Sequence, residues 1–319
     1  MPLAQPPPVS GVFPVLPTPF AADGAPDTAG LTTLVRYLLR SGVDGMTFPG
    51  VASEVASLSE SERVGLTGHV IAEVAGRVPV VVGVSSNDEA VTLRLAQLAV
   101  AQGAAALMIA APAHVKDTAG QIRHFAAISN AVPGTPLMLQ NVPPPAGAGL
   151  DPSVLLEILA AVPAIRYVKE EALPSGQRLT QVLAGAPASL LGVLGGAGGR
   201  YITDELRRRA CGTMPAIELA EVHVHLFAAH RAGDAKLVRQ LFTRMLPVLN
   251  IQAVFRWSLT KHVLCSRGLI AHAGQRTAGP VLDALDRVEV DAFMADLADL
   301  LLPQAELARL HAGSDPGAS

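Results

Sequence analysis

Short apolar segments, each bounded by glycine or proline, recur along this chain and alternate with longer stretches of helical periodicity. Eight such segments lie at residues 11–16, 45–49, 79–83, 106–110, 136–141, 165–169, 189–194 and 210–214. Each is apolar nearly throughout, which is typical of strands in a parallel sheet covered on both faces. Stretches such as 27–41 and 59–75 carry leucine and valine at helical spacing. Eight strand–helix units predict an α/β protein with a (β/α)8 TIM barrel.

The chain continues beyond the eighth predicted strand. Four further helical stretches lie at 217–231, 234–246, 251–267 and 288–310. One of them completes the eighth unit, and the others form a C-terminal helical extension that packs on the barrel or on a partner subunit. The predicted organisation is therefore a flexible N-terminus at 1–10, the barrel at 11–230, the extension at 231–312 and a disordered tail at 313–319.

Composition excludes several classes of function. The 24 basic residues are balanced by 27 acidic ones, whereas binding to nucleic acid or to a membrane surface needs a concentrated basic patch. Two cysteines do not make a disulfide framework. Residues 1–10 lack the features of a secretion signal, and no apolar run approaches the roughly 20 residues of a membrane span. We therefore expect a cytoplasmic protein.

One of the four lysines, Lys169, ends the apolar segment 165–169. Burial at such a place disfavours the charged ammonium, which leaves the amine as a nucleophile. Side chains alternate along a strand, so Glu171 shares the face of Lys169 and lies one step nearer the barrel mouth. The alternatives are a strand-end lysine that reaches solvent and a solvated loop carboxylate.

Reactive groups of a TIM barrel lie at the C-terminal ends of its strands. The residues expected there are Thr18, the loop 50–54, His114, Gln140, Asn141, Lys169, Glu171 and the glycines Gly195 to Gly199. No compact spacing of His, Asp and Glu suggests metal ligands, so we expect neither a metal nor a cofactor. His223, His225 and Lys261 are expected at the surface, and Tyr167 and Trp257 in packing roles.

Several of these segments together resemble the dihydrodipicolinate synthase / N-acetylneuraminate lyase superfamily of class I aldolases and dehydratases on (β/α)8 barrels. The resemblance covers about residues 10 to 305. It rests on residues 11–20, 42–45, 50–54 with Leu58, Glu62 and Arg63, 76–80, 141–143 and 168–169. It implies that Lys169 forms an imine with an α-keto acid, and that the protein is a homotetramer.

The chain departs from the usual family pattern at several positions. The two loop hydroxyls of the family are absent at Val51 and Ala52, and Ser53 replaces a glycine. Gln140 stands where the family has its catalytic tyrosine. The family arginine that grips a dicarboxylic partner falls near Pro145, and the tyrosine pair after strand four is replaced by residues 113–114. This altered pattern resembles the 2-keto-3-deoxy-sugar-acid dehydratases, typified by L-2-keto-3-deoxyarabonate dehydratase.

The resemblance implies roles for the strand-end residues. Lys169 attacks the ketone, Glu171 is the first candidate and His114 the second candidate for acid–base catalysis, and Gln140 orients the substrate or a water. The expected substrate contacts are Ser53, Ala52, Thr18, Asn141, Gly195 and Gly196. The glycine-rich loop 195–200 could bind the phosphate of a phosphorylated sugar, as loops after strands seven and eight of such barrels often do. The resemblance favours unphosphorylated keto acids instead.

Two other functions stay open at this point. One is a pyruvate-dependent aldolase or synthase, because loss of the tyrosine argues against aldol condensation without excluding carbon–carbon cleavage. The other is a non-catalytic relative that binds a keto acid.

Overall fold

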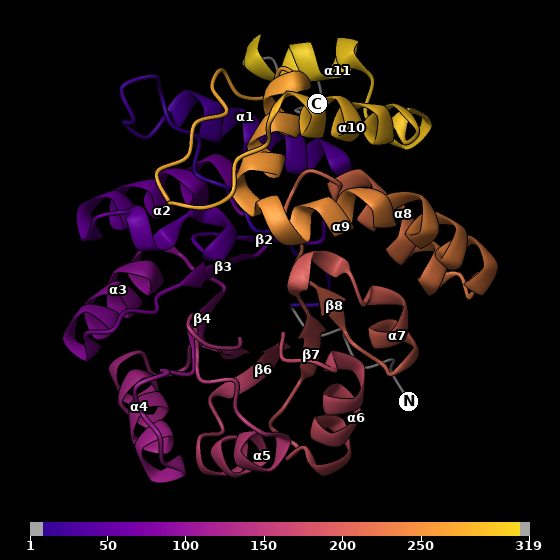
Figure 1. The fold of residues 1–319 in the computed structure, drawn as a ribbon. Helices are drawn as coiled ribbons and strands as arrows, with labels where there is room; N and C mark the ends of the chain where they lie inside the picture. Colours follow the sequence, from indigo (N-terminus) through magenta and orange to yellow (C-terminus); the bar gives the residue numbers. More distant parts are fainter. Residues whose placement is uncertain (1–8, 313–319) are drawn as a thin grey trace.

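A closed ring of parallel strands forms the centre of the computed structural model, which describes residues 9–312 (Figure 1). The eight strands are β1 (Gly11–Val12), β2 (Met46–Thr47), β3 (Val80–Gly83), β4 (Ala106–Ala110), β5 (Leu137–Asn141), β6 (Ile165–Glu170), β7 (Gly192–Gly195) and β8 (Gly212–Thr213). Each pairs in parallel with its neighbours in the order β1-β8-β7-β6-β5-β4-β3-β2. This order confirms the predicted (β/α)8 barrel.

The ring closes just beyond the end of β1. Val15 pairs in parallel with Thr47, the last residue of β2. The N–H of Leu16 donates to the carbonyl of Thr47 at 3.0 Å, and the N–H of Thr47 donates to that of Pro14 at 2.9 Å. The short β1 is thus extended by a less regular segment that supplies the remaining ladder bonds.

Helices between the strands form the outer layer (Figure 1). They are α1 (Thr28–Ser41), α2 (Glu60–Val74), α3 (Glu89–Gln102), α4 (Thr118–Ala131), α5 (Pro152–Ala161), α6 (Ser175–Gly185), α7 (Ile202–Arg207) and α8 (Ala220–Arg231). The first four begin at side-chain caps, which satisfy backbone N–H groups that have no partner inside a helix. These caps are Asp27, Ser59, Asp88 and Asp117, and Ser59 with Glu62 completes the predicted capping box.

The strands separate two apolar cores. The larger one fills the space between strands and helices, and the smaller one fills the barrel interior. The inner core contains Val9, Phe13, Val15, Val81, Ala106, Met108, Met138, Tyr167, Leu194 and Met214. Tyr167 therefore packs inside the barrel, and its hydroxyl accepts the N–H of Val9 at 3.4 Å. Residues 1–8 of the predicted flexible N-terminus, and the predicted disordered tail 313–319, lie outside the described residues.

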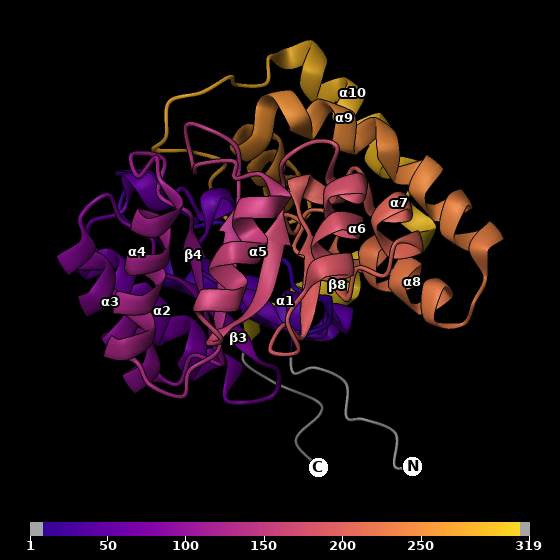
Figure 2. The same ribbon diagram turned by 90° about the horizontal axis from the view of Figure 1, so that it is seen from below.

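The C-terminal extension consists of α9 (Ala235–Ser266), α10 (Ala284–Ala295) and α11 (Gln304–Arg309). The helices predicted at 234–246 and 251–267 form the single helix α9, because the helix continues through Pro247. The single helix predicted at 288–310 is instead divided, since the short 3-10 helix η4 (Ala298–Leu300) and the irregular residues beside it separate α10 from α11. In Figure 2, α9 and α10 lie above the barrel, at the end toward which the strand arrows point.

Helix length and polarity bear on membrane insertion. Between residues 9 and 312, no helix combines the length and the apolar character that crossing a bilayer demands.

Candidate active site at the carboxyl ends of the strands

Lys169 lies near the carboxyl end of β6 and faces the barrel interior. It is in register with Gln140 on β5 and with Leu194 on β7. Residues in register on parallel neighbours point to the same side of a sheet, and Leu194 belongs to the inner core. The residue is only 4% exposed. The amine thus stands on top of the apolar filling of the barrel, as the strand pattern predicts.

The carboxylate of Glu171 forms one ion pair and accepts two hydrogen bonds at this point. Its Oε1 lies 3.5 Å from Lys169 Nζ and accepts the backbone N–H of Ala197 at 3.2 Å. Its Oε2 accepts the side-chain amide of Gln140 at 2.7 Å. The Glu171 side chain is 14% exposed, against 5% for Lys169. Three of the four predicted catalytic residues therefore lie together, with Glu171 on the outer side. These three, Lys169, Glu171 and Gln140, form the Lys169 cluster.

The two predicted substrate-binding glycines have different surroundings. A Cβ at Gly196 would lie 2.5 Å from Glu171 Cγ, so a glycine is needed for the carboxylate to sit here. A Cβ at Gly195 would instead collide with the carboxylate of Glu205 on α7. Gly196 therefore shapes the Lys169 cluster directly, whereas Gly195 allows close packing against Glu205.

The loop after β2 is held by its own hydroxyl groups. Ser53 Oγ accepts the N–H of Gly50 at 2.9 Å and donates to the carbonyl of Leu16. Thr18 Oγ1 donates to the carbonyl of Ser53 at 2.7 Å, and both side chains are fully buried. These hydroxyls are committed to protein partners, so they position the loop.

What the same loop offers a ligand is its backbone. The short 3-10 helix η1 (Val51–Ser53) begins in it, and Ala52 packs against the inner core. The first N–H groups of a helix have no intrahelical acceptor. Val51 and Ala52 are therefore the residues of this loop whose backbone N–H groups can bind a carboxylate above the barrel interior.

Asn141 lies on the other face of β5. Its Nδ2 donates to both carboxylate oxygens of Glu170 and to the carbonyl of Leu150, each at 3.0 Å. Its Oδ1 accepts the N–H of Leu150 at 2.7 Å. Burial raises the pKa of Glu170, against which the hydrogen bonds from Asn141 act. Asn141 thus satisfies a buried carboxyl outside the ring of strands and is not brought to the Lys169 cluster.

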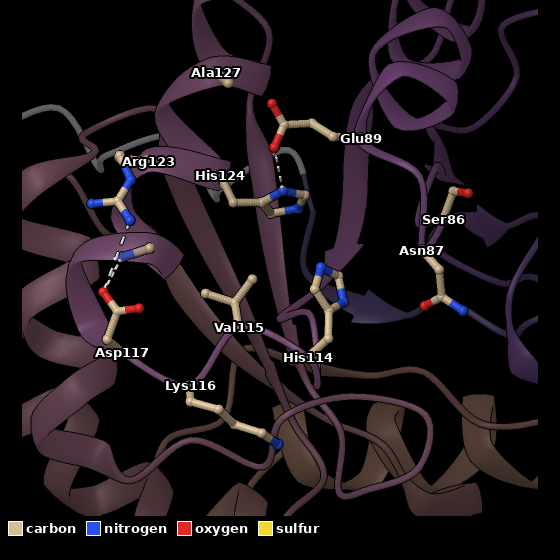
Figure 3. A pocket seen from close by; sticks show the side chains of 11 residues that line it. Ser86, Asn87, Glu89, His114, Val115, Lys116, Asp117, Arg123, His124 and Ala127 are labelled. Carbon is tan, nitrogen blue, oxygen red and sulfur yellow. Dashed lines mark hydrogen bonds and ion pairs between the residues drawn. The ribbon is translucent and has the colours of Figure 1, made fainter.

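His114 also lies away from the Lys169 cluster. It is exposed and lines a cavity of about 750 Å³ at the loops that precede α3 and α4 (Figure 3). The lining includes Asn87, Glu89 and His124 but none of Lys169, Glu171 or Gln140. Burial lowers the pKa of His124, which pairs with Glu89 at 3.8 Å. Glu171 is therefore the acid–base candidate that the structure places beside the lysine.

Two predictions about surface residues are wrong. Lys261 is fully buried and forms an ion pair with Glu54, because α9 crosses the loop after β2. His223 is fully buried against Gly199, and its Nδ1 lies 2.9 Å from the carbonyl of Leu219. Burial lowers the pKa of His223 to about 4. His225, by contrast, is exposed, as predicted.

Trp257 does more than pack. Its indole N–H donates to the carbonyl of Val51 at 2.9 Å and so reaches the loop after β2. No local pattern signals this contact, because the two residues are 206 positions apart. Across the described part of the chain, no three His, Cys, Asp or Glu side chains gather so as to hold a metal ion.

Comparison with known proteins gives a consistent result. The sequence profile of the dihydrodipicolinate synthetase family matches residues 8–283. The chain is 35% identical over 173 residues to 4-hydroxy-tetrahydrodipicolinate synthase of Bacillus subtilis, which is 53% of this chain and 58% of that protein. The match thus spans little more than half the length of this relative.

Solved structures resemble nearly the whole chain. Dihydrodipicolinate synthase from Rhodopseudomonas palustris superposes with a TM-score of 0.85 at 29% identity, covering 92% of this chain and 99% of that one. A prophage protein of the dihydrodipicolinic acid synthase family from E. coli K12, solved in complex with pyruvate, has a TM-score of 0.82 at 25% identity. That match covers 91% of this chain and 98% of the other.

Proposed function

The chain belongs to the dihydrodipicolinate synthetase family, whose members are lyases of the aldolase or synthase type, and we propose that it dehydrates a 2-keto-3-deoxy sugar acid through an imine on Lys169. One observation carries the proposal: the buried amine of Lys169 lies 3.5 Å from a carboxylate whose other oxygen accepts the Gln140 amide. This arrangement joins a nucleophile, a proton acceptor and an orienting group, but it lacks the tyrosine hydroxyl at position 140.

The first step forms the imine. The neutral amine of Lys169 adds to the C2 ketone and forms a carbinolamine. The C2 oxygen takes one proton from the nitrogen and one from solvent and leaves as water, which gives an iminium cation. Lys169 Nζ lies 3.5 Å from Glu171 Oε1, so the carboxylate stands beside the newly formed iminium. The N–H groups of Val51 and Ala52 hold the substrate carboxylate.

The second step eliminates water from the substrate chain. The iminium withdraws electrons and acidifies the C3 hydrogens, and Glu171 removes one of them to give an enamine. The enamine expels the C4 hydroxyl, which takes the proton from Glu171 and leaves as water. Hydrolysis of the remaining imine frees Lys169. Gln140 cannot carry a proton, but its amide fixes the carboxylate that does.

A pyruvate-dependent synthase or aldolase is the second candidate. The Bacillus subtilis relative bears the name of a synthase, and the E. coli prophage protein was solved with pyruvate. Against this, an amide at position 140 cannot relay the proton that a tyrosine hydroxyl relays in aldol chemistry. In the proposed dehydration Glu171 carries the proton itself, so no tyrosine relay is needed.

Borohydride trapping followed by product analysis tests these functions. The protein is treated with borohydride and pyruvate, and the adduct is located by mass spectrometry, with Lys169→Met as the control. An adduct confined to Lys169 supports the Schiff base, and its absence favours the non-catalytic relative. With 2-keto-3-deoxy acids as substrates, a semialdehyde without pyruvate indicates dehydration, whereas free pyruvate indicates cleavage.

The homotetramer implied by the family resemblance remains a prediction. Light scattering of the purified protein measures its mass in solution. A mass of four chains of 33.0 kDa supports the tetramer, and any smaller mass contradicts it.

A further inference from the structure

We propose that Arg200 binds a second anionic group at the far end of the substrate, so that the lyase takes 2-keto acids that carry a distal carboxylate. The inference rests on the proposed function, because it assumes that the keto end of the same molecule is bound at Lys169. Its basis is a half-buried guanidinium, close to Glu171, that has no carboxylate partner of its own.

Arg200 belongs to the loop that also binds the catalytic carboxylate. This loop follows β7 and contains the short 3-10 helix η3 (Ala197–Gly199). The N–H of Ala197 donates to Glu171 at 3.2 Å, and the N–H of Arg200 donates to the carbonyl of Ala197 at 3.4 Å. The start of the Arg200 side chain is therefore fixed relative to the Glu171 carboxylate by two hydrogen bonds, both donated by backbone N–H groups.

The guanidinium is held by a neutral partner. Arg200 Nη1 donates to the side-chain oxygen of Gln252 on α9 at 2.8 Å. Gly198 makes room for this contact, since a Cβ there would lie 3.0 Å from the Gln252 oxygen and 3.3 Å from Nη1. Within residues 9–312, none of the ion pairs includes Arg200. The contact orients the guanidinium and leaves it without a carboxylate in direct contact.

The remaining donors of Arg200 are open to a ligand. A guanidinium has five N–H donors, arranged as a fork that matches a carboxylate. None of its nitrogens is among the buried polar atoms without a partner in the described chain. The donors that Gln252 does not use are therefore accessible to solvent, and a carboxylate can replace that solvent with stronger, charge-assisted bonds.

The surrounding charges favour an incoming anion. Partial burial lowers the pKa of Arg200, and the nearby charge of Arg256 adds to this effect, while Tyr201, Glu218 and Glu171 oppose it. Glu218 is a weak counter-charge, because burial raises its own pKa to about 7. A bound carboxylate therefore offsets the unfavourable partial burial of the Arg200 charge.

The backbone of α9 breaks beside this cluster. Arg256 has φ 38° and ψ −107° inside the helix, a conformation that non-glycine residues rarely adopt. Strain of this kind persists only where surrounding contacts enforce it, and it gathers at functional sites. The break lies between Gln252, which holds Arg200, and Trp257, which bonds to Val51 in the loop after β2. Helix α9 thus connects the loops assigned to the two ends of the substrate.

The competing explanation is that Arg200 only ties α9 to the loop after β7. A neutral donor serves that purpose equally well, because Gln252 offers a neutral oxygen. A half-buried charge without a partner costs free energy that a simple tie does not require. The electrostatics therefore favour a ligand over a tie.

Trapping with matched keto acids tests the proposal. The concentration that gives half-maximal borohydride adduct is measured for 2-oxopentanedioate and 2-oxopentanoate, which have the same chain length but differ in the distal carboxylate. The wild-type protein is expected to prefer the diacid by about tenfold or more, as for a charged hydrogen bond. In Arg200→Met this preference disappears while trapping by pyruvate is unchanged. Arg207→Met, an exposed arginine on α7, is the matched control and keeps the preference.

The outcomes separate this proposal from the function on which it rests. Absence of any pyruvate adduct in the wild-type protein removes the Schiff base itself. A normal pyruvate adduct with equal half-maximal concentrations for the two longer acids leaves the Schiff base intact and overturns the role of Arg200. This second result needs no variant, so it stands even if Arg200→Met fails to fold.

Discussion

Lys261 and Glu54 form an ion pair in which both side chains are completely inaccessible to solvent. The other carboxylate oxygen of Glu54 accepts the N–H groups of Arg276 and Thr277, each at 2.7 Å. Glu54 belongs to the loop after β2, whereas its three partners belong to the C-terminal extension. The extension therefore fixes the loop whose backbone amides are assigned to the substrate carboxylate.

Removing one member of this pair is expected to be costly. In Lys261→Met the carboxylate of Glu54 is left buried without its counter-charge, and breaking such a pair costs about 3–5 kcal/mol. Chemical denaturation measures the loss in the free energy of unfolding. Adding Glu54→Gln recovers part of it, because the uncompensated charge is gone. The exposed Lys236→Met is the control, and an equal effect of both lysine variants would contradict the role of the pair.

Gly196 is expected to control the position of Glu171. In Gly196→Ala the new methyl group meets Glu171 Cγ, so the carboxylate must move away from Lys169 and Gln140. Turnover is expected to fall by about tenfold or more, since a misplaced catalytic group loses much of its effect. Gly65→Ala is the control, because a Cβ at this exposed helical position meets nothing within 4 Å. Equal activity of the two variants would show that the position of Glu171 is unimportant.

The barrel was predictable because apolar runs and helical periods are local patterns. All eight strands and the face shared by Lys169 and Glu171 follow from them. Local patterns do not show that Gln140 faces the barrel interior while Asn141 faces the outer layer. That assignment depends on which residue of β5 is in register with Lys169. One step along a strand turns a side chain from the interior to the outer layer.

Contacts between distant segments could not be predicted. Lys261 and Glu54 are 207 positions apart, and the sequence around Lys261 does not indicate that it pairs with a buried carboxylate. The burial of His223 likewise depends on the glycine loop after β7 packing against α8. Sequence patterns give the elements and their faces, whereas the partners of buried polar groups follow from how the extension folds back over the barrel.

Glu218 is expected to make stability depend on pH. Burial raises its pKa in the folded protein to about 7, above the ordinary value of 4.5. Between these values the folded state holds a proton that the unfolded state releases, so this group lowers the stability as the pH rises from about 4.5 to 7. In Glu218→Gln this loss is absent, a difference on the order of 3 kcal/mol above pH 7. Denaturation curves at several pH values check it, with the exposed Glu157→Gln as the control.

Glu171→Gln separates imine formation from proton transfer. The amide keeps nearly the size of the carboxylate and can still accept the N–H of Ala197, but it cannot take a proton from C3 or return one to the leaving hydroxyl. Borohydride trapping of pyruvate on Lys169 is expected to persist, while turnover of a 2-keto-3-deoxy acid falls by about 10²-fold or more. The exposed Glu289→Gln on α10 is the control and keeps full turnover. Unchanged turnover in Glu171→Gln would remove Glu171 from the mechanism, because within the Lys169 cluster only this side chain both contacts the amine and can move a proton at neutral pH.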